Sequence, residues 1–250
     1  MNISGINNMP DYGQVASGKR INSAADDAAG LAISNKLGVR ADGTNVAVNN
    51  AKEGVNVTKI ADGAYESILD RLQRIRELSV QSMNGFYGAS DLEAIQSEID
   101  QHLMGIGEAA RNTVYNEQKL LDGSMATMEI ASNPTGKGSS IKLYSATLEN
   151  LGLDGYSVMN GDANLDAIDN AIQMVSSQRS SLGASANGLE AGIRTNQNVY
   201  ENLTASKSKI EDLDMAKAAE ELNKKKTMQS VEIAMQKKQN EQDKIILRMF

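Results

Sequence analysis

Residues 165–210 decide the fold of this chain, and they read LDAIDNAIQMVSSQRSSLGASANGLEAGIRTNQNVYENLTASKSKI. Steps that alternate between three and four residues connect a mostly apolar series: Leu165, Ile168, Ile172, Val175, Arg179, Leu182, Ala186, Leu189, Ile193, Asn196, Tyr200, Leu203, Lys207 and Ile210. This heptad stripe predicts a long helix that packs lengthwise on a partner helix. At 1.5 Å per residue, a helix over residues 164–210 would extend about 70 Å, which exceeds the width of a compact domain.

The partner is expected over residues 27–84. A similar stripe runs through Ala61, Ala64, Ile68, Leu72, Ile75 and Leu78. Ser23 and Asp26 have the spacing of a capping box before this helix, and Asp26 and Asp27 suit the positive end of its dipole. Two long helices of this kind, packed side by side, predict an antiparallel coiled-coil rod.

Shorter elements are expected between the two long helices. Ser90 and Glu93 have capping-box spacing and open a helix over about residues 90–110. Beyond it the apolar period changes to two, so that residues 125–130 and 141–144 predict the strands of a β-hairpin around a glycine-containing turn. The fold class is therefore mainly α, with a small β-hairpin region over about residues 114–160.

Composition narrows the class of protein. The chain has no Trp, two Phe and no Cys, so packing must rely on aliphatic residues, and neither a disulfide framework nor thiol chemistry is available. The net charge of −7 argues against a nucleic-acid partner. No apolar run approaches the roughly 20 residues that span a bilayer, and the first residues do not have the pattern of a cleaved signal, so we expect no membrane insertion.

Catalytic chemistry is not predicted. His102 is the only histidine, and it lies beside an apolar helix face, where a surface histidine is the simpler interpretation. The sequence Gly105-Ile106-Gly107 lacks the preceding strand and third glycine of a nucleotide site. Adjacent Asp26 and Asp27 diverge by about 100° on a helix, which favours capping over a paired-carboxylate or cation site. We therefore expect no enzyme activity, no cofactor and no metal.

Several tracts carry a resemblance to one family. They are SGKRINSAADDAAGLAI at residues 17–33, LQRIRELSVQ at 72–81, NEQKLLDG at 116–123, LGASANGLE at 182–190 and ENLTASKSKIEDLDMA at 201–216. In this order and spacing they resemble bacterial flagellin over nearly the whole chain. Only residues 1–16 precede the first tract, with Gly5, Pro10 and Gly13 interrupting any helix, and Lys237 and Lys238 occupy positions where flagellins tend to have small or apolar residues. The resemblance is therefore to a short flagellin without variable outer domains and with a shortened N-terminal segment.

The resemblance implies three parts and a structural role. Residues 1–22 would be a shortened core segment and connector, residues 23–210 the rod domain, and residues 211–250 the C-terminal core helix. The chain would be an extracellular, secreted subunit of the flagellar filament that serves motility. Residues for rod packing and self-assembly would be Leu72, Ile75, Leu165, Ile168, Ile172, Val175, Leu182, Leu189, Ile193, Leu203 and Ile210. Partners would be other flagellin subunits, an export chaperone at the C-terminal segment and the filament cap.

A polar helix face carries a second implication. Flagellins are recognised there by the animal flagellin-sensing Toll-like receptor, and the matching residues are Gln73, Arg74, Leu78, Gln81 and Glu98. From the residues alone, a solvated face with supporting ion pairs explains the same pattern. Two alternatives for the whole chain also stay open: a hook-filament junction protein, and a non-polymerising flagellin-like remnant that acts as a binding module.

Overall fold

The computed structural model describes residues 12–159 and 163–247. These described residues form two compact units, one from residues 12–42 and 200–247 and the other from residues 43–159 and 163–199. We call them the terminal unit and the central unit. Of the residues expected to interrupt a helix ahead of Ser17, Gly5 and Pro10 lie outside the described residues. The expectation for Gly13 is wrong, because Gly13 lies inside the short helix α1 (Tyr12–Ser17).

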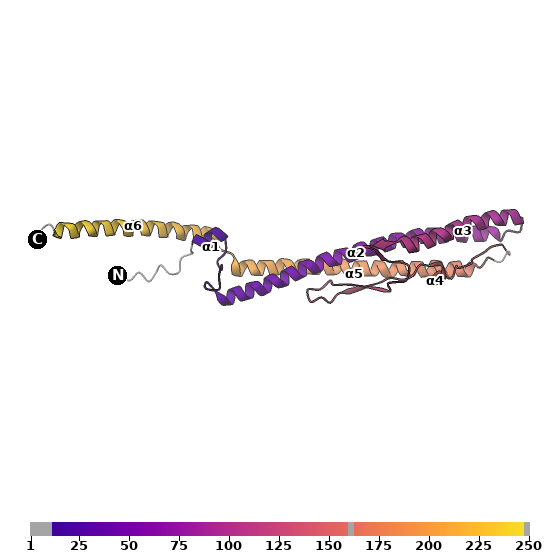
Figure 1. The fold of residues 1–250 in the computed structure, drawn as a ribbon, viewed down its shortest axis with the longest axis horizontal. Helices are drawn as coiled ribbons and strands as arrows, with labels where there is room; N and C mark the ends of the chain where they lie inside the picture. The colour runs from indigo at the N-terminus through magenta and orange to yellow at the C-terminus, as the bar shows by residue number, and fades with distance from the viewer. Residues whose placement is uncertain (1–11, 160–162, 248–250) are drawn as a thin grey trace. The chain divides into compact units, whose positions relative to one another are not determined.

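Long helices dominate both units, as expected for a mainly α fold (Figure 1). They are α2 (Ala28–Ser82), α3 (Ala89–Asn112), α5 (Leu165–Glu211) and α6 (Met215–Leu247), with short α1 (Tyr12–Ser17) and α4 (Leu148–Leu151). The bounds of α2, α3 and α5 agree within two residues with the expected ranges 27–84, 90–110 and 164–210. In the described residues no helix is both long and apolar enough to cross a membrane.

The start of α2 differs from the expected capping box. Asp27, the residue before the helix, caps it by accepting the main-chain N–H of Gly30 at 2.8 Å. Asp26 instead closes the preceding turn, where its Oδ2 accepts the main-chain N–H of Asn22 and of Ser23 at 3.0 and 2.8 Å. A side chain on Gly30 would collide with Asp27 and with the buried Ile21, so glycine is required there for close packing.

The predicted box at Ser90 and Glu93 is wrong in position. Helix α3 begins at Ala89 after Gly88, and Asp91 supplies the acceptor: its Oδ2 receives the main-chain N–H of Gly88 at 3.0 Å. Both capping predictions missed because several acidic and hydroxyl residues crowd each helix start. Spacing alone does not choose among them.

Four short strands lie between α3 and α4. Strands β1 (Val114–Tyr115) and β2 (Gln118–Lys119) pair antiparallel across a two-residue turn, whose residues Asn116 and Glu117 have φ of 47° and 66°. Strands β3 (Thr127–Ile130) and β4 (Ser139–Lys142) form the expected hairpin, with Met128 opposite Ile141. The first hairpin was not foreseen, since its turn lacks the glycine that such turns prefer.

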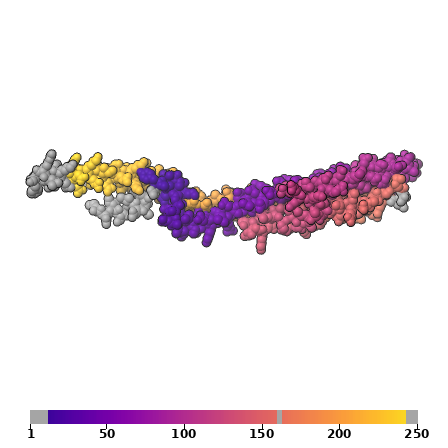
Figure 2. All heavy atoms as spheres, in the orientation of Figure 1, coloured from indigo at the N-terminus to yellow at the C-terminus, as the bar shows by residue number. Residues whose placement is uncertain are grey.

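The core of the central unit lies where α2, α3 and α5 meet the hairpin region. Its fully buried members include Tyr65, Ile68, Leu72, Ile75, Ile99, Ile106, Leu120, Leu121, Ile141 and Ile168. Gly54 on α2 gives Ile130 of β3 and Leu189 of α5 room to approach the helix. In Figure 2 the pink atoms of the β3–β4 region lie against the purple atoms of α2, in agreement with the hydrogen bond from the Asn50 amide to the Ala131 carbonyl at 3.2 Å.

Two tyrosines fasten the hairpin region to α2. The hydroxyl of Tyr65 donates to the main-chain carbonyl oxygen of Tyr144 at 2.6 Å, and burial raises the pKa of Tyr65 to about 12. The hydroxyl of Tyr156 donates to Ser79 Oγ at 2.8 Å. Both hydroxyl groups thus find partners inside the core, which removes the cost of burying them.

Candidate interaction surfaces

The heptad stripe of α5 faces the partner helix along the central unit. Ile168, Val175, Leu182 and Leu189 are buried, and Leu165, Ile172 and Ile193 are partly buried against the same core. Leu72 and Ile75 of α2 are fully buried in that core. In the terminal unit Leu203 and Ile210 are partly buried. The sequence pattern therefore identified the packing face of the helix.

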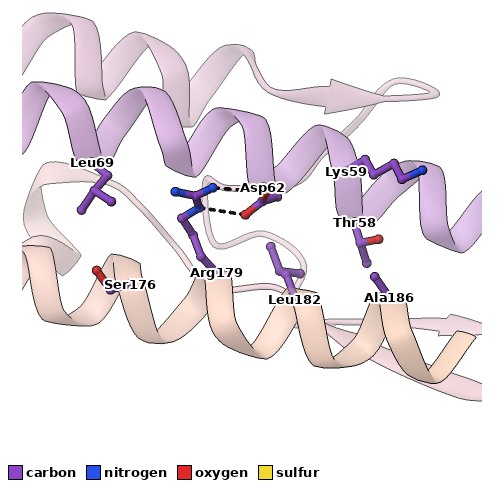
Figure 3. Close-up of a pocket in the computed structure, with 9 residues that line it drawn as sticks. Thr58, Lys59, Asp62, Leu69, Ser176, Arg179, Leu182 and Ala186 are labelled. Atoms are coloured by element: carbon purple, nitrogen blue, oxygen red, sulfur yellow. Dashed lines mark hydrogen bonds and ion pairs between the residues drawn. The ribbon is translucent and has the colours of Figure 1, made fainter. Parts of the chain in front are cut away.

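Ion pairs flank this apolar seam and set how the helices align. The Arg179 guanidinium of α5 donates to both carboxylate oxygens of Asp62 on α2, at 2.8 and 3.4 Å, as the dashed lines in Figure 3 show. Farther along α2, Arg76 Nε donates to Asp169 Oδ1 at 2.6 Å. Residue numbers rise on α2 as they fall on α5, so the helices run antiparallel. Hydrogen bonding to the two aspartates raises the pKa of each arginine.

An exposed polar cluster occupies neighbouring faces of α2 and α3. Arg74 is its centre: Nη2 and Nε lie 2.9 and 3.1 Å from Glu98 Oε1 of α3, and Nη1 lies 3.0 Å from Glu77 Oε2. Hydrogen bonds to Glu98 and then Glu77 raise the pKa of Arg74. These contacts with Glu98 and Glu77 hold the Arg74 guanidinium in a fixed position at the surface. Arginines placed in this way often act as anchors in protein interfaces.

The other residues expected on this face separate into two groups. Gln73 and Gln81 are exposed, and the amide of Gln81 donates to the Tyr87 hydroxyl at 2.9 Å. Leu78 is only 2% exposed and belongs to the core with Leu72 and Ile75. Leu78 therefore supports the face from beneath and offers no surface for contact. We refer to Gln73, Arg74, Gln81 and Glu98 as the polar face.

The terminal unit contains a cluster of polar contacts around Glu211 that was not predicted from the sequence. We call Lys19, Ser34, Lys207 and Glu211 the clasp. The carboxylate of Glu211 lies 2.5 Å from Lys19 Nζ, 3.7 Å from Lys207 Nζ and 2.7 Å from the hydroxyl of Ser34. Main-chain hydrogen bonds run beside it, from Arg20 N–H to the Glu211 carbonyl at 2.7 Å and from Leu213 N–H to the Gly18 carbonyl at 2.9 Å. The segment before α2 is thereby joined to the end of α5.

In the clasp, hydrogen bonds to the Glu211 carboxylate outweigh the opposing effect of burial on its pKa. Glu211 is 7% exposed, yet the hydrogen bonds from Lys19 and then Ser34 lower its pKa. The same contact raises the pKa of Lys19. No local spacing indicated this pair, because Lys19 and Glu211 lie near opposite ends of the chain. The only signal in the sequence was that both lie inside the two family-like tracts.

The described residues contain no group of three or more histidines, aspartates or glutamates able to hold a metal ion. His102 was expected at the surface, but its side chain is only 26% exposed on α3, with Nε2 at 3.9 Å from Glu98 Oε1 and a buried Nδ1 that has no hydrogen-bond partner. A single imidazole of this kind does not assemble a nucleophile or a base with its orienting partner.

Comparison with known proteins identifies the family of this chain. Residues 7–126 match the model of the bacterial flagellin N-terminal helical region, and residues 165–250 match that of the C-terminal helical region. A flagellin of Halalkalibacterium halodurans is 35% identical over 244 residues, which cover 95% of this chain and 89% of the relative. The chain belongs to the bacterial flagellin family. Members of this family are structural subunits of the flagellar filament, not enzymes. Only residues 127–164, with the β3–β4 hairpin and α4, lie between the two matched regions, as expected of a short flagellin without outer domains.

Two solved structures share the helical fold of this chain. A crystal structure of Bacillus cereus flagellin superposes with a TM-score of 0.53 at 23% identity, over 59% of this chain and 88% of that chain. The structure of a putative flagellar hook-associated protein from Vibrio parahaemolyticus superposes with a TM-score of 0.64 at 14% identity, over 75% of this chain and all of that one. The helical fold is therefore common to flagellins and hook-associated proteins, and sequence identity is what assigns this chain to the flagellins.

Proposed function

We propose that this chain polymerises, with copies of itself or with another flagellin, into the extracellular flagellar filament that drives motility. The observation that carries the proposal is the 35% identity to a flagellin across 95% of this chain. The antiparallel packing of α2 on α5 supports it, because a stiff pair of long helices gives each subunit extended flanks for lateral contact.

Exposed apolar residues on α6 support a need for partners. Met228, Val231, Ile233 and Met235 are between 39% and 68% exposed. Apolar side chains gathered on one helix are commonly covered in an assembly. We propose that neighbouring subunits cover them in the filament and that an export chaperone covers this C-terminal segment before secretion. The filament cap would be the third partner.

Seeded polymerisation tests the filament proposal against its rivals. Purified protein is mixed with short fragments of its own filaments, or of a related flagellin filament, and viewed by negative-stain electron microscopy. Growth of long tubes supports a filament subunit. Short plugs at the fragment ends would favour a hook-filament junction protein, and persistent monomers at all concentrations would favour a remnant that acts as a binding module.

We further propose that the polar face binds the animal flagellin-sensing Toll-like receptor. The support is geometric: Arg74 is exposed, held by Glu98 and Glu77, and flanked by the exposed amides of Gln73 and Gln81. A cation that is already oriented loses less conformational freedom on binding.

A matched pair of arginine variants tests this second proposal. Arg74→Ala should weaken binding of the receptor ectodomain at least tenfold in surface plasmon resonance, as loss of a central interface arginine often does. Arg194→Ala removes an exposed arginine from a different helix, α5, and serves as the control. Equal affinities for the two variants would exclude the polar face as the binding surface.

A further inference from the structure

The loop between α2 and α3, residues 83–88, contains one aromatic side chain that is almost fully exposed to solvent. Phe86 is 93% exposed, in a chain with only two phenylalanines and no tryptophan. Met83 beside it is 52% exposed. Large apolar side chains that stay uncovered in a monomer commonly mark a contact surface. A ring of this size offers much contact area for little loss of side-chain freedom, so it suits an anchor.

Hydrogen bonds hold this loop in one conformation. The main-chain N–H of Asn84 bonds the Gln81 carbonyl at 3.1 Å, and that of Tyr87 bonds the Asn84 carbonyl at 3.2 Å. The Tyr87 hydroxyl accepts from the Gln81 amide at 2.9 Å. Phe86 is therefore displayed by an ordered turn, and binding through it does not first have to order the loop.

The same unit has a hollow that fits such a ring. It lies between α2 and α5, has a volume of about 380 Å³ and is lined by Thr58, Lys59, Asp62, Leu69, Ser176, Arg179, Leu182, Gly183 and Ala186. In Figure 3 Leu69 and Thr58 of α2 point toward α5, and Leu182 of α5 points toward α2. A cavity of about 150 Å³ is enough for a benzene ring. We call this hollow the seam groove.

Chemistry at the seam groove favours a phenylalanine with acidic neighbours. Leu69 and Leu182 offer aliphatic contact, and the Arg179 guanidinium, fixed by Asp62, offers a cation to the face of a ring. Lys59 stands exposed at the rim. Near Phe86 in the sequence, Glu93 of α3 is exposed, and its carboxylate is opposite in charge to Lys59.

From these observations we infer that Phe86 of one copy inserts into the seam groove of a second copy, with Glu93 of the first facing Lys59 of the second. The inference rests on the proposed filament function and names one contact within it. Phe86 and Asp62 are 24 residues apart along the chain, mostly in helix, so ring and groove stand about 36 Å apart along the central unit. Two different patches form a head-to-tail contact, and such a contact builds an open helical filament when the rotation between successive copies does not close a ring.

The absence of cysteine makes the contact directly testable. Gly85→Cys, which has open space around it and leaves the neighbouring Phe86 ring in place, and Gly183→Cys are put in separate chains, which are mixed and oxidised with copper phenanthroline. Gly183 has open space around it, so the new thiol would face the hollow. Gly188→Cys, also in open space but on another face of α5, replaces Gly183→Cys in the control mixture. We expect at least a tenfold excess of disulfide-linked dimer in the first mixture.

Polymerisation of a second variant gives an independent measurement. Phe86→Ala removes an exposed ring, so the helical circular dichroism spectrum should not change, while the concentration needed for seeded growth should rise at least tenfold. Phe86→Leu should recover part of the loss, since it retains apolar area. Filaments that grow equally well from Phe86→Ala and contain no specific cross-link would overturn this contact and leave the proposed function intact. Specific dimers without any filament would support the contact and overturn the proposed function, whereas neither dimers nor filaments would overturn both.

Discussion

Lys19 and Glu211 join the two ends of the chain by an ion pair of 2.5 Å in which the glutamate is almost fully buried. The pKa of Glu211 is lowered, so its stabilising contribution is present above the ordinary glutamate value of about 4.3 and is lost as the pH falls through the lower folded value. The pKa of Lys19 is raised, so its contribution holds below about 10.4 and is lost as the pH rises through the higher folded value.

Amide hydrogen exchange measures this pH-dependent stabilisation by Lys19 and Glu211 at single residues. Between these two limits, the amides of Arg20 and Leu213 should exchange slowly, because the clasp holds their hydrogen bonds closed. Lys19→Met should speed their exchange at neutral pH and weaken the acid-side dependence that comes from Glu211, which Ser34 still stabilises. Lys217→Met, which removes an exposed lysine of α6, is the control. Unchanged exchange at both amides in Lys19→Met would show that the ion pair does not stabilise the joint.

Tyr65→Phe should destabilise the central unit by about 1–2 kcal/mol, because the partly buried carbonyl of Tyr144 loses its donor. Urea unfolding followed by circular dichroism measures this difference. Tyr200→Phe alters a tyrosine of α5 that is 37% exposed, and it should be close to neutral.

Tyr65 should also titrate late. Its pKa of about 12 predicts that stability falls as the pH rises from about 10, where an unfolded tyrosine ionises, toward 12. Difference absorbance of phenolate near 295 nm should contain a component that is absent below pH 11 in the folded protein. That component should vanish in Tyr65→Phe, and its persistence would assign the late titration to another tyrosine.

Side-chain truncations at two positions of α5 should lower the free energy of unfolding by different amounts. Ile168→Ala removes a fully buried side chain and should cost about 2–5 kcal/mol of unfolding free energy, since the cavity cannot collapse fully. Leu203→Ala, at an equivalent position of the stripe but only partly buried, should cost less than half as much. Chemical denaturation of both variants gives the comparison, and equal costs would contradict the difference in packing.

Gly54 and Gly63, both on α2, offer a matched test of close packing. A Cβ on Gly54 would lie 3.1 Å from side-chain atoms of both Ile130 and Leu189, whereas Gly63 faces open space. Gly54→Leu should therefore destabilise by about 1–3 kcal/mol through overpacking. Gly63→Leu should stabilise by up to about 1 kcal/mol, since leucine is the better helix former. Thermal unfolding of the two variants distinguishes these signs.

The sequence was informative where structure depends on local periodicity. Steps of three and four residues predicted which side of α5 faces the core, because helical geometry alone fixes that side. The alignment of α2 on α5 could not be predicted, since Arg76 with Asp169 and Arg179 with Asp62 are pairs between distant segments. Leu78 illustrates a related limit. A family comparison linked it to a surface role, while its place in the heptad stripe, next to Ile75, indicated the burial that the structure has.

α5 is a single uninterrupted helix, yet its tightly packed apolar residues end at Leu189, and farther on the stripe includes Asn196, Tyr200 and Lys207. The part of α5 beyond Leu189 buries fewer apolar side chains, so it would unfold locally while the part before Leu189 stays helical. On warming, such a helix would melt in two stages instead of one. Subunits could then be threaded, joined or released at their termini while the middle of each chain stays folded.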